Sequence, residues 1–260
     1  APDIARPPAA MPDRIAVSGI AFVEFAANEV EAAELAGLFG TLGFRRTGRH
    51  VSKDVTLYRQ GDINLVINTE REGFAHASYV THGTSVCAMG LKVEDAAATV
   101  ARASALGANL FEQAVGPGEM TIPAIRGVGG GVIHFIDQKP PLARVWDLEF
   151  TALEDPNPPR DAGLARIDHI GHTMNYGEML TWLLFYIAIF RTHKTPMVDV
   201  IDPSGVVRSQ AIETEDGSLR LTLNGAENDR TLAGHFIAES FGASVQHLAF
   251  ATADIFATAA

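Results

Sequence analysis

The sequence predicts an α+β protein built from repeated βαβββ modules, arranged as two tandem domains of which the second is incomplete. The first observation is a repeat: residues 85–95 match residues 244–254, each opening with Ser-Val, continuing as a short apolar strand and closing on an Asp that can cap an Ala-rich helix. The second is a match between residues 20–22 and 167–169, each in a strand that leads into an amphipathic segment. Strand starts therefore fall near residues 18, 85, 166 and 244, which indicates one unit used four times.

The individual elements follow from hydrophobic periodicity and turn signals. In the first module we expect a helix over 30–42 and strands over 45–50, 55–59 and 63–68, with a hairpin turn at 60–62. In the second we expect a helix over 96–106 and strands near 110–112, 120–125 and 132–137. In the third we expect a helix over 178–190 and strands over 198–202, 206–213 and 219–224. The fourth reaches only its first helix, from residue 255 onward.

The strongest internal break is the Pro-rich segment at residues 155–160. We therefore expect four parts: a Pro-rich leader or linker over 1–17, a first domain without metal over 18–154, a linker over 155–164 and a second, metal-binding domain over 165–260. The second domain lacks the last three strands of its fourth module. We expect it to be truncated, with one sheet edge and cavity wall left open.

Composition excludes several classes of function. The 260 residues carry a net charge of −11, and the longest basic run is Arg45-Arg46, so we expect neither nucleic acid nor membrane as a partner. No stretch approaches the roughly 18 apolar residues that span a bilayer. The single cysteine, Cys87, stands among apolar residues and predicts a buried thiol in a cytoplasmic protein. A small ligand is the expected partner.

Two of the nine histidines have a pattern that predicts a metal site. His169 and His247 lie at matching positions in the first strands of two modules that should pair, and each faces the same way as its apolar neighbours. The matching residues of the first half are Phe22 and Ala88, which cannot bind metal. Two neutral imidazoles suit Fe, Zn, Co or Ni, and a carboxylate from the missing last strand would complete a two-His-one-carboxylate site. The other histidines that lack such a pattern are predicted to be core or surface residues: His50, His76, His82, His134, His172 and His193.

At residues 49–68, 82–87, 116–125 and 246–250 the sequence resembles the bacterial 4-hydroxyphenylpyruvate dioxygenases. The resemblance extends from about Gly19 to the last residue. It implies a pair of vicinal-oxygen-chelate (glyoxalase-like) domains with iron bound only in the C-terminal one. It also implies that His169 and His247 are the first two iron ligands, that the third is a glutamate beyond Ala260, and that Ser209 and Asn224 face the substrate.

The sequence departs from these dioxygenases at two positions. Thr222 stands where they usually have Pro, and His235 stands where they have Gln in a helix that lines the substrate site. His235, residues 254–256 and the Pro-rich leader resemble instead the dioxygenase-like domain that is fused behind a sugar-isomerase-like barrel in bacterial 3-dehydroshikimate dehydratases. In those fusions the conversion of 3-dehydroshikimate to protocatechuate belongs to the barrel. We favour this fused type.

Two alternatives stay open: a free-standing dioxygenase that converts 4-hydroxyphenylpyruvate and O₂ to homogentisate and CO₂, and a non-catalytic binding or structural module. The expected cofactor is Fe(II) or another divalent metal (Mg, Mn, Co or Zn), and the expected substrate is a small aromatic or cyclic oxo acid, bound with help from Ser209, Asn224 and His235. We also expect an upstream barrel domain and a homo-oligomer. With two of three ligands present, this chain should bind metal weakly and be inactive, but the ring nitrogens of His169 and His247 should lie a few ångströms apart.

Overall fold

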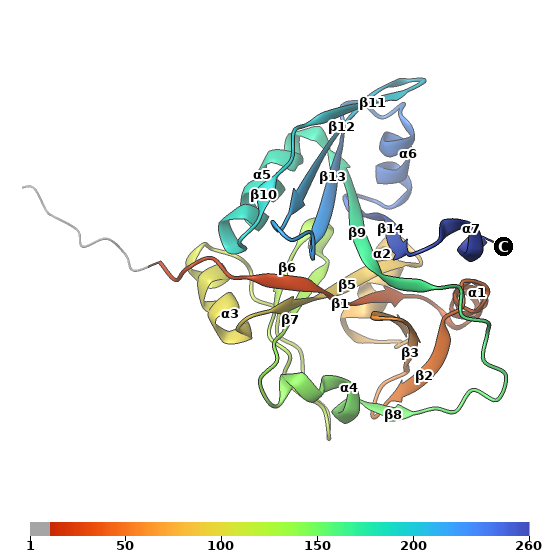
Figure 1. Cartoon of the computed structure of the whole chain (residues 1–260). Coiled ribbons are helices and arrows are strands. Elements are labelled where there is room, and N and C mark those ends of the chain that lie inside the picture. Colours follow the sequence, from red (N-terminus) through yellow and green to blue (C-terminus); the bar gives the residue numbers. More distant parts are fainter. Residues whose placement is uncertain (1–10, 260) are drawn as a thin grey trace, which may run out of the picture.

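The strands of the protein form two mixed sheets. The computed structural model describes residues 11–259, and the calls that fall on residues 1–10 and 260 lie outside this range. Figure 1 shows the two sheets one above the other, with the chain passing from the lower sheet to the upper one through β9 (Leu164–Asn175). Of the predicted α+β fold of repeated βαβββ modules, the mixture of helices and strands in two sheets is confirmed, and the repetition of the modules remains a prediction. The division into tandem domains and a linker remains a prediction.

The first sheet contains eight strands in the order β6-β7-β5-β1-β4-β3-β2-β8. Its strands are β1 (Val17–Ala26), β2 (Arg45–His50), β3 (Val55–Gln60), β4 (Ile63–Asn68), β5 (Ser85–Val93), β6 (Ala124–Arg126), β7 (Val132–Ile136) and β8 (Phe150–Ala152). Its helices are α1 (Glu29–Thr41), α2 (Gly73–His82), α3 (Ala96–Ala105) and α4 (Val145–Leu148), with short 3-10 turns η1 (Val128–Gly130) and η2 (Leu142–Arg144). Asn28 and Asp95 accept hydrogen bonds from the first turns of α1 and α3, so the predicted Asp cap is present.

The second sheet has the order β10-β12-β13-β9-β14, with β11 paired to β12. Besides β9, its strands are β10 (His193–Lys194), β11 (Val198–Asp202), β12 (Gly205–Glu213), β13 (Arg220–Ala226) and β14 (Ser244–Thr252). Its helices are α5 (Tyr176–Ile189), α6 (Leu232–Glu239) and α7 (Ile255–Ala259). Helix α5 packs on β13 and β12 and buries Met179, Leu183, Tyr186 and Ile189. Packing against the sheet removes this apolar face from water, which stabilises a helix of such high hydrophobicity within the fold.

Two predicted strands of the second module are wrong. Only an isolated bridge joins Leu110 to Ile125, and β6 begins at Ala124, so residues 111–123 form an irregular loop. Gly116, Pro117 and Pro123 explain the difference, because proline cannot donate to a strand ladder and glycine weakens one. The loop covers one face of the first sheet. Helix α2 was not predicted, and its side-chain contacts extend the wall of the same region.

One hydrophobic core joins the two sheets. Phe44 and Phe250 place their ring centroids 5.6 Å apart, and Phe135 and Phe190 lie 6.1 Å apart, so aromatic side chains of one half contact those of the other. Phe44, Phe135 and Phe190 belong to a single cluster of buried apolar residues, and the partly buried Phe250 packs against it. Burial of this common surface supplies most of the driving force that holds the halves together.

The central strand pairs of the two sheets share the same irregularities. In the pair β1–β5 the register shifts at Ala21 and Cys87, and in the pair β9–β14 it shifts at Asp168 and Gln246. Each shift inserts one extra residue, which is the geometry of a β-bulge and turns the neighbouring side chain. The shared shifts place Phe22 opposite Gly90 and Glu24 opposite Ala88 in the first sheet. They place His169 opposite Ala249 and Gly171 opposite His247 in the second.

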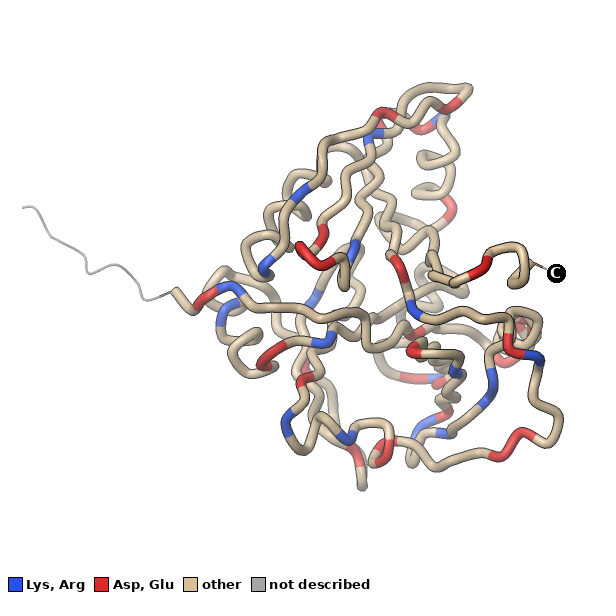
Figure 2. The backbone as a smooth tube through the Cα atoms, viewed as in Figure 1, with Lys and Arg blue, Asp and Glu red and all other residues tan. Residues whose placement is uncertain are grey.

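Charged residues are dispersed over both halves. Figure 2 shows basic and acidic positions interspersed along the described part of the chain rather than gathered on one element. Within residues 11–259 no helix is long and apolar enough to cross a membrane. Cys87 is buried and free, as expected for a core thiol, and burial raises the pKa of its thiol well above the usual range.

Candidate metal centre

Strands β9 and β14 bring the two predicted metal ligands together. The Nε2 atoms of His169 and His247 lie 3.2 Å apart, and the ring planes are nearly perpendicular at 87°. The bulge at Gln246 sets this geometry, because the residue before it, Val245, pairs with His172 while His247 pairs with Gly171. The expected convergence of the two rings is therefore present.

Gly171 provides the space for the His247 ring. A Cβ atom at this position would lie 2.1 Å from the nearest ring carbon of His247, which is closer than real Cβ contacts come. A side chain at residue 171 would therefore push the ring away from His169. The glycine is a steric requirement of the histidine pair.

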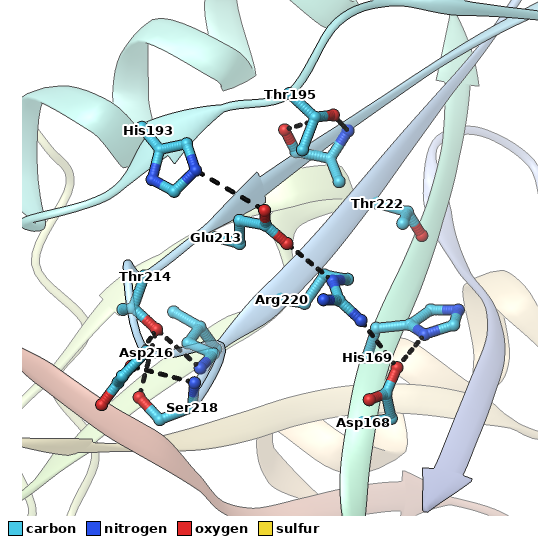
Figure 3. A network of polar contacts seen from close by, with 12 residues as sticks. Asp168, His169, His193, Thr195, Glu213, Thr214, Asp216, Ser218, Arg220 and Thr222 are labelled. Atoms are coloured by element: carbon cyan, nitrogen blue, oxygen red, sulfur yellow. Dashed lines mark hydrogen bonds and ion pairs between the residues drawn. The ribbon is translucent and has the colours of Figure 1, made fainter.

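Asp168 orients the ring of His169. Its Oδ2 atom lies 2.9 Å from His169 Nδ1 and accepts a hydrogen bond from Arg220 Nη1 at 3.1 Å (Figure 3). The hydrogen bond with His169 and the positive charges of Arg220 and Arg166 hold the pKa of Asp168 below its usual range. A carboxylate at Nδ1 favours the tautomer in which Nε2 keeps a free lone pair, the arrangement found behind metal-bound histidines.

A chain of ion pairs continues away from Asp168 along the sheet. Arg220 Nε donates to Glu213 Oε2 at 2.8 Å, and His193 Nε2 lies 3.5 Å from Glu213 Oε1 (Figure 3). His193 was expected to be a core or surface residue, and the structure places it beside Glu213. The register explains this, because β12 pairs Glu213 with Arg220 of β13 and with His193 of β10.

The histidine pair fits two adjacent positions around a divalent metal. With metal–nitrogen bonds of about 2.0–2.1 Å, a separation of 3.2 Å corresponds to an N–metal–N angle of roughly 100°. Burial, and then the charge of His169, lowers the pKa of His247, which favours the neutral imidazole that binds metal. Within residues 11–259 no group of three His, Cys, Asp or Glu side chains is placed to hold an ion. The pair therefore leaves several positions for other donors.

Two of the three predicted substrate contacts lie on the sheet beside the histidines. Ser209 Oγ donates to Asn224 Oδ1 at 2.8 Å. Asn224 pairs with Thr173, two residues from Gly171 along β9, so these side chains share the face of the histidine pair. His235 is exposed on α6, where its charge contributes to lowering the pKa of Asp202 at the end of β11. The substrate roles of all three residues remain predictions.

Sequence reasoning missed Asp168 and Gly171. Strict strand alternation places Asp168 on the face opposite His169, but the bulge at Asp168 breaks the alternation and lets its carboxylate reach the ring. The signal for Gly171 was present, because a glycine inside an apolar strand often marks a close approach by another group. The register between β9 and β14 was needed to show that the approaching group is the His247 ring.

Residues 12–151 match the family described as hydroxyphenylpyruvate dioxygenase (HPPD), N-terminal. The chain belongs to the hydroxyphenylpyruvate dioxygenase family. The predicted resemblance is thereby confirmed.

Proteins named as dehydratases and proteins named as dioxygenases are both similar to this chain. A 3-dehydroshikimate dehydratase of Pseudomonas putida is 38% identical over 94% of this chain, which spans 38% of that protein. A 4-hydroxyphenylpyruvate dioxygenase of Pseudomonas aeruginosa is 33% identical over 94% of this chain and 69% of its own length. Among solved structures, a xylose isomerase-like TIM barrel/4-hydroxyphenylpyruvate dioxygenase fusion protein has a TM-score of 0.79 and 36% identity, and the match covers 97% of this chain and 40% of that one.

Proposed function

We propose that the chain is a metal-dependent unit of the hydroxyphenylpyruvate dioxygenase type and that His169 and His247 supply two of the metal ligands. The observation that carries the proposal is the 3.2 Å separation of their Nε2 atoms, with Asp168 behind one ring. Fe(II) is the first candidate, because two imidazoles with open positions suit it, and Mg, Mn, Co and Zn are the alternatives. Further ligands would come from solvent, from substrate or from a residue outside 11–259.

In this proposal the protein residues hold and orient the metal and contact the substrate. A bound divalent metal would supply Lewis acidity and charge stabilisation toward an oxo acid. His169 and His247 would hold it, Asp168 would keep the His169 proton on Nδ1, and Arg220 would keep Asp168 ionised. The Ser209–Asn224 pair would present hydroxyl and amide groups to a polar substituent of the substrate.

We favour the version of this unit that is fused to a dehydratase barrel. Two 3-dehydroshikimate dehydratases, from P. putida and P. aeruginosa, are each 38% identical to this chain, against 33% for the P. aeruginosa dioxygenase. In this version a barrel would perform the conversion of 3-dehydroshikimate to protocatechuate, and the present unit would support it. A free cysteine that is buried suits a cytoplasmic setting.

A free-standing 4-hydroxyphenylpyruvate dioxygenase is the second candidate. The chain covers 69% of one such relative, and the Ser209–Asn224 pair shares a face with the histidines, where an aromatic oxo acid could lie. This version would bind an aromatic oxo acid and consume O₂. A non-catalytic module is the third candidate.

Oxygen uptake separates these candidates. The protein would be loaded anaerobically with one equivalent of Fe(II), its bound iron measured, and 4-hydroxyphenylpyruvate added with air. The favoured version predicts bound iron without substrate-dependent uptake, and the free-standing dioxygenase predicts uptake that His247→Ala abolishes. Because two histidines alone should bind metal weakly, only the absence of bound iron and of any other divalent metal at millimolar metal concentration would contradict the metal-dependent unit itself.

A further inference from the structure

A large cavity lies on the first sheet and is lined by neither His169 nor His247. Its volume is about 700 Å³, which is within the range of about 300–1,000 Å³ typical of small-molecule sites. Strands β1, β4, β6 and β7 contribute lining residues to its floor, and the irregular loop over residues 111–123 and helix α4 wall it. The loop that replaced the two predicted strands therefore encloses space rather than extending the sheet.

Glu24, Phe22 and His134 reach the cavity from one face of the first sheet. Phe22 of β1 pairs with Gly90 of β5, which in turn pairs with His134 of β7. Glu24 lies two residues beyond Phe22 along β1, so its side chain faces the same side. The Phe22 ring lies over Gly90, which brings it beside His134.

Glu24 presents a carboxyl group to this space. Asn68 Nδ2 donates to its Oε1 atom at 2.7 Å, which is the one hydrogen bond that its carboxyl makes with residues 11–259. Two other carboxyl groups of the cavity are more fully paired: Glu149 with His50 at 2.7 Å and Glu119 with Lys53 at 3.0 Å. Burial raises the pKa of Glu24, and it outweighs the opposite effects of the Asn68 hydrogen bond and of Lys53 and His50.

His134 offers a second polar atom without a partner. Its side chain is buried, with 8% of the residue exposed, and its Nδ1 atom makes no hydrogen bond within the described residues. Burial lowers the pKa of His134 to about 4, so the ring is neutral near pH 7. A neutral imidazole can accept a hydrogen bond through one nitrogen, and a buried polar atom without a partner is costly unless a ligand or water satisfies it.

The remaining walls favour a positively charged group attached to an apolar body. The Phe22 ring lies 5.7 Å from His134 and 5.9 Å from Trp146, and Phe74, Phe111 and Phe150 also line the cavity. Aromatic faces attract cations, and Arg59 over Trp146 at 5.1 Å and Arg126 over Phe74 and Phe111 at 4.6 Å already use this attraction from outside the lining, which leaves Phe22 and Phe150. Carboxylates outnumber the single lysine, Lys53, among the lining residues: Glu24, Glu70, Glu72, Glu112, Glu119 and Glu149. The summed potential in the cavity is therefore negative.

We propose that this cavity binds a small primary amine with a ring-sized apolar body. The ammonium group donates hydrogen bonds to the Glu24 carboxylate and to His134 Nδ1, and the body packs against Phe22 and Trp146 beside Ala124, the neighbour of His134 on β6. The site is separate from the histidine pair and does not depend on a metal.

The probe is 2-phenylethylamine, titrated into EDTA-treated protein of full length. In a Trp182→Phe background Trp146 is the sole tryptophan, so its fluorescence reports on the cavity directly. We expect 2-phenylethylamine to bind at least about 10-fold more tightly than 2-phenylethanol or 3-phenylpropionate, because hydrogen bonds to charged groups are the stronger ones. Equal binding of the amine and the alcohol, or no binding of the amine at millimolar concentration, would overturn the proposal.

Paired variants locate the bound amine. Glu24→Gln keeps an acceptor for Asn68 but removes the charge, and should weaken amine binding at least about 10-fold. Glu72→Gln makes the same change at an exposed lining residue and should alter it less than about 2-fold. Ala124→Leu fills the space beside His134 without changing charge and should abolish binding. Unchanged affinity in Ala124→Leu, or equal effects of Glu24→Gln and Glu72→Gln, would place the amine elsewhere and refute the assignment.

Discussion

The strand pair β1–β5 of the first sheet and the strand pair β9–β14 of the second have the same bulges but different chemistry. A ring from one strand lies over a glycine of its neighbour in both: Phe22 over Gly90 in the first sheet and His247 over Gly171 in the second. In the second sheet the other strand supplies His169 beside the ring, and two ring nitrogens meet. The bulged strand pair thus brings the same backbone positions close together in both sheets, and the side chains at these positions decide what each sheet can bind.

The position of Gly171 in the second sheet is taken by Glu24 in the first. Both residues lie opposite the residue that follows the bulge, which is His247 in one sheet and Ala88 in the other. Exchanging a large and a small residue across the strands converts a histidine pair into a cavity with a carboxyl group. The first sheet is therefore better described as a differently equipped site than as an inert scaffold.

The largest expected effect comes from filling the space under the His247 ring. Gly171→Ala should weaken binding of Co²⁺ or Zn²⁺ by more than about 100-fold, because a Cβ there displaces a ligand, and lesions beyond the ligands already cost about 10–100-fold. The matched change Gly90→Ala crowds Phe22 instead and should leave metal affinity within about 2-fold. Competition with a chromophoric chelator measures the metal affinity of both variants. Tight metal binding by Gly171→Ala would show that the metal does not bind at the histidine pair.

Acid should destabilise the first sheet through His134. The pKa of this histidine in the folded protein, about 4, lies below its ordinary value of about 6.5, so the unfolded chain binds a proton that the folded chain does not. The stability present above pH 6.5 is then lost as the pH falls toward 4, by up to about 3 kcal/mol. Urea unfolding at pH 7 and pH 5 should show a smaller loss in His134→Phe than in the parent. The control is His235→Phe at an exposed position, which should lose as much unfolding free energy between pH 7 and pH 5 as the parent does.

A smaller effect is expected at the carboxylate behind His169. Asp168→Asn removes the charge that favours the Nδ1–H tautomer and should weaken Zn²⁺ binding about 10-fold. Glu213→Gln, one ion pair further along the chain of contacts, should change it by about 2-fold or less. Isothermal titration of both variants checks the order. Equal effects of the two substitutions on Zn²⁺ affinity would show that these ion pairs act through the stability of the fold rather than through the orientation of the His169 ring.

The smallest effect concerns the predicted substrate face. Ser209→Ala removes the hydroxyl that donates to Asn224, and should weaken binding of 4-hydroxyphenylpyruvate to the metal-loaded protein about 5-fold, the value of one hydrogen bond. Ser218→Ala, in the turn before β13, should have no effect. A Ser209→Ala variant with unchanged affinity would remove Ser209 from the proposed substrate site.

The parts of the fold that follow from local patterns were predictable, and those that depend on a partner strand were not. The strands over residues 45–50, 63–68 and 198–202 have the predicted bounds, because alternation and turn residues are local signals. The repeat identified the histidine pair, because equivalent strands place equivalent residues alike. The bulge at Asp168 and the cavity under residues 111–123 were missed, since both depend on contacts between segments far apart in the sequence.

The central claim is that His169 and His247 bind one divalent metal together. Nitrogen-15 NMR of the histidine rings during titration with Zn²⁺ tests it directly. The account predicts that the first equivalent shifts Nε2 of both residues together, that Nδ1 of His169 keeps its proton toward Asp168, and that EDTA reverses the change. A first equivalent that shifts other histidines, or only one member of the pair, would contradict it.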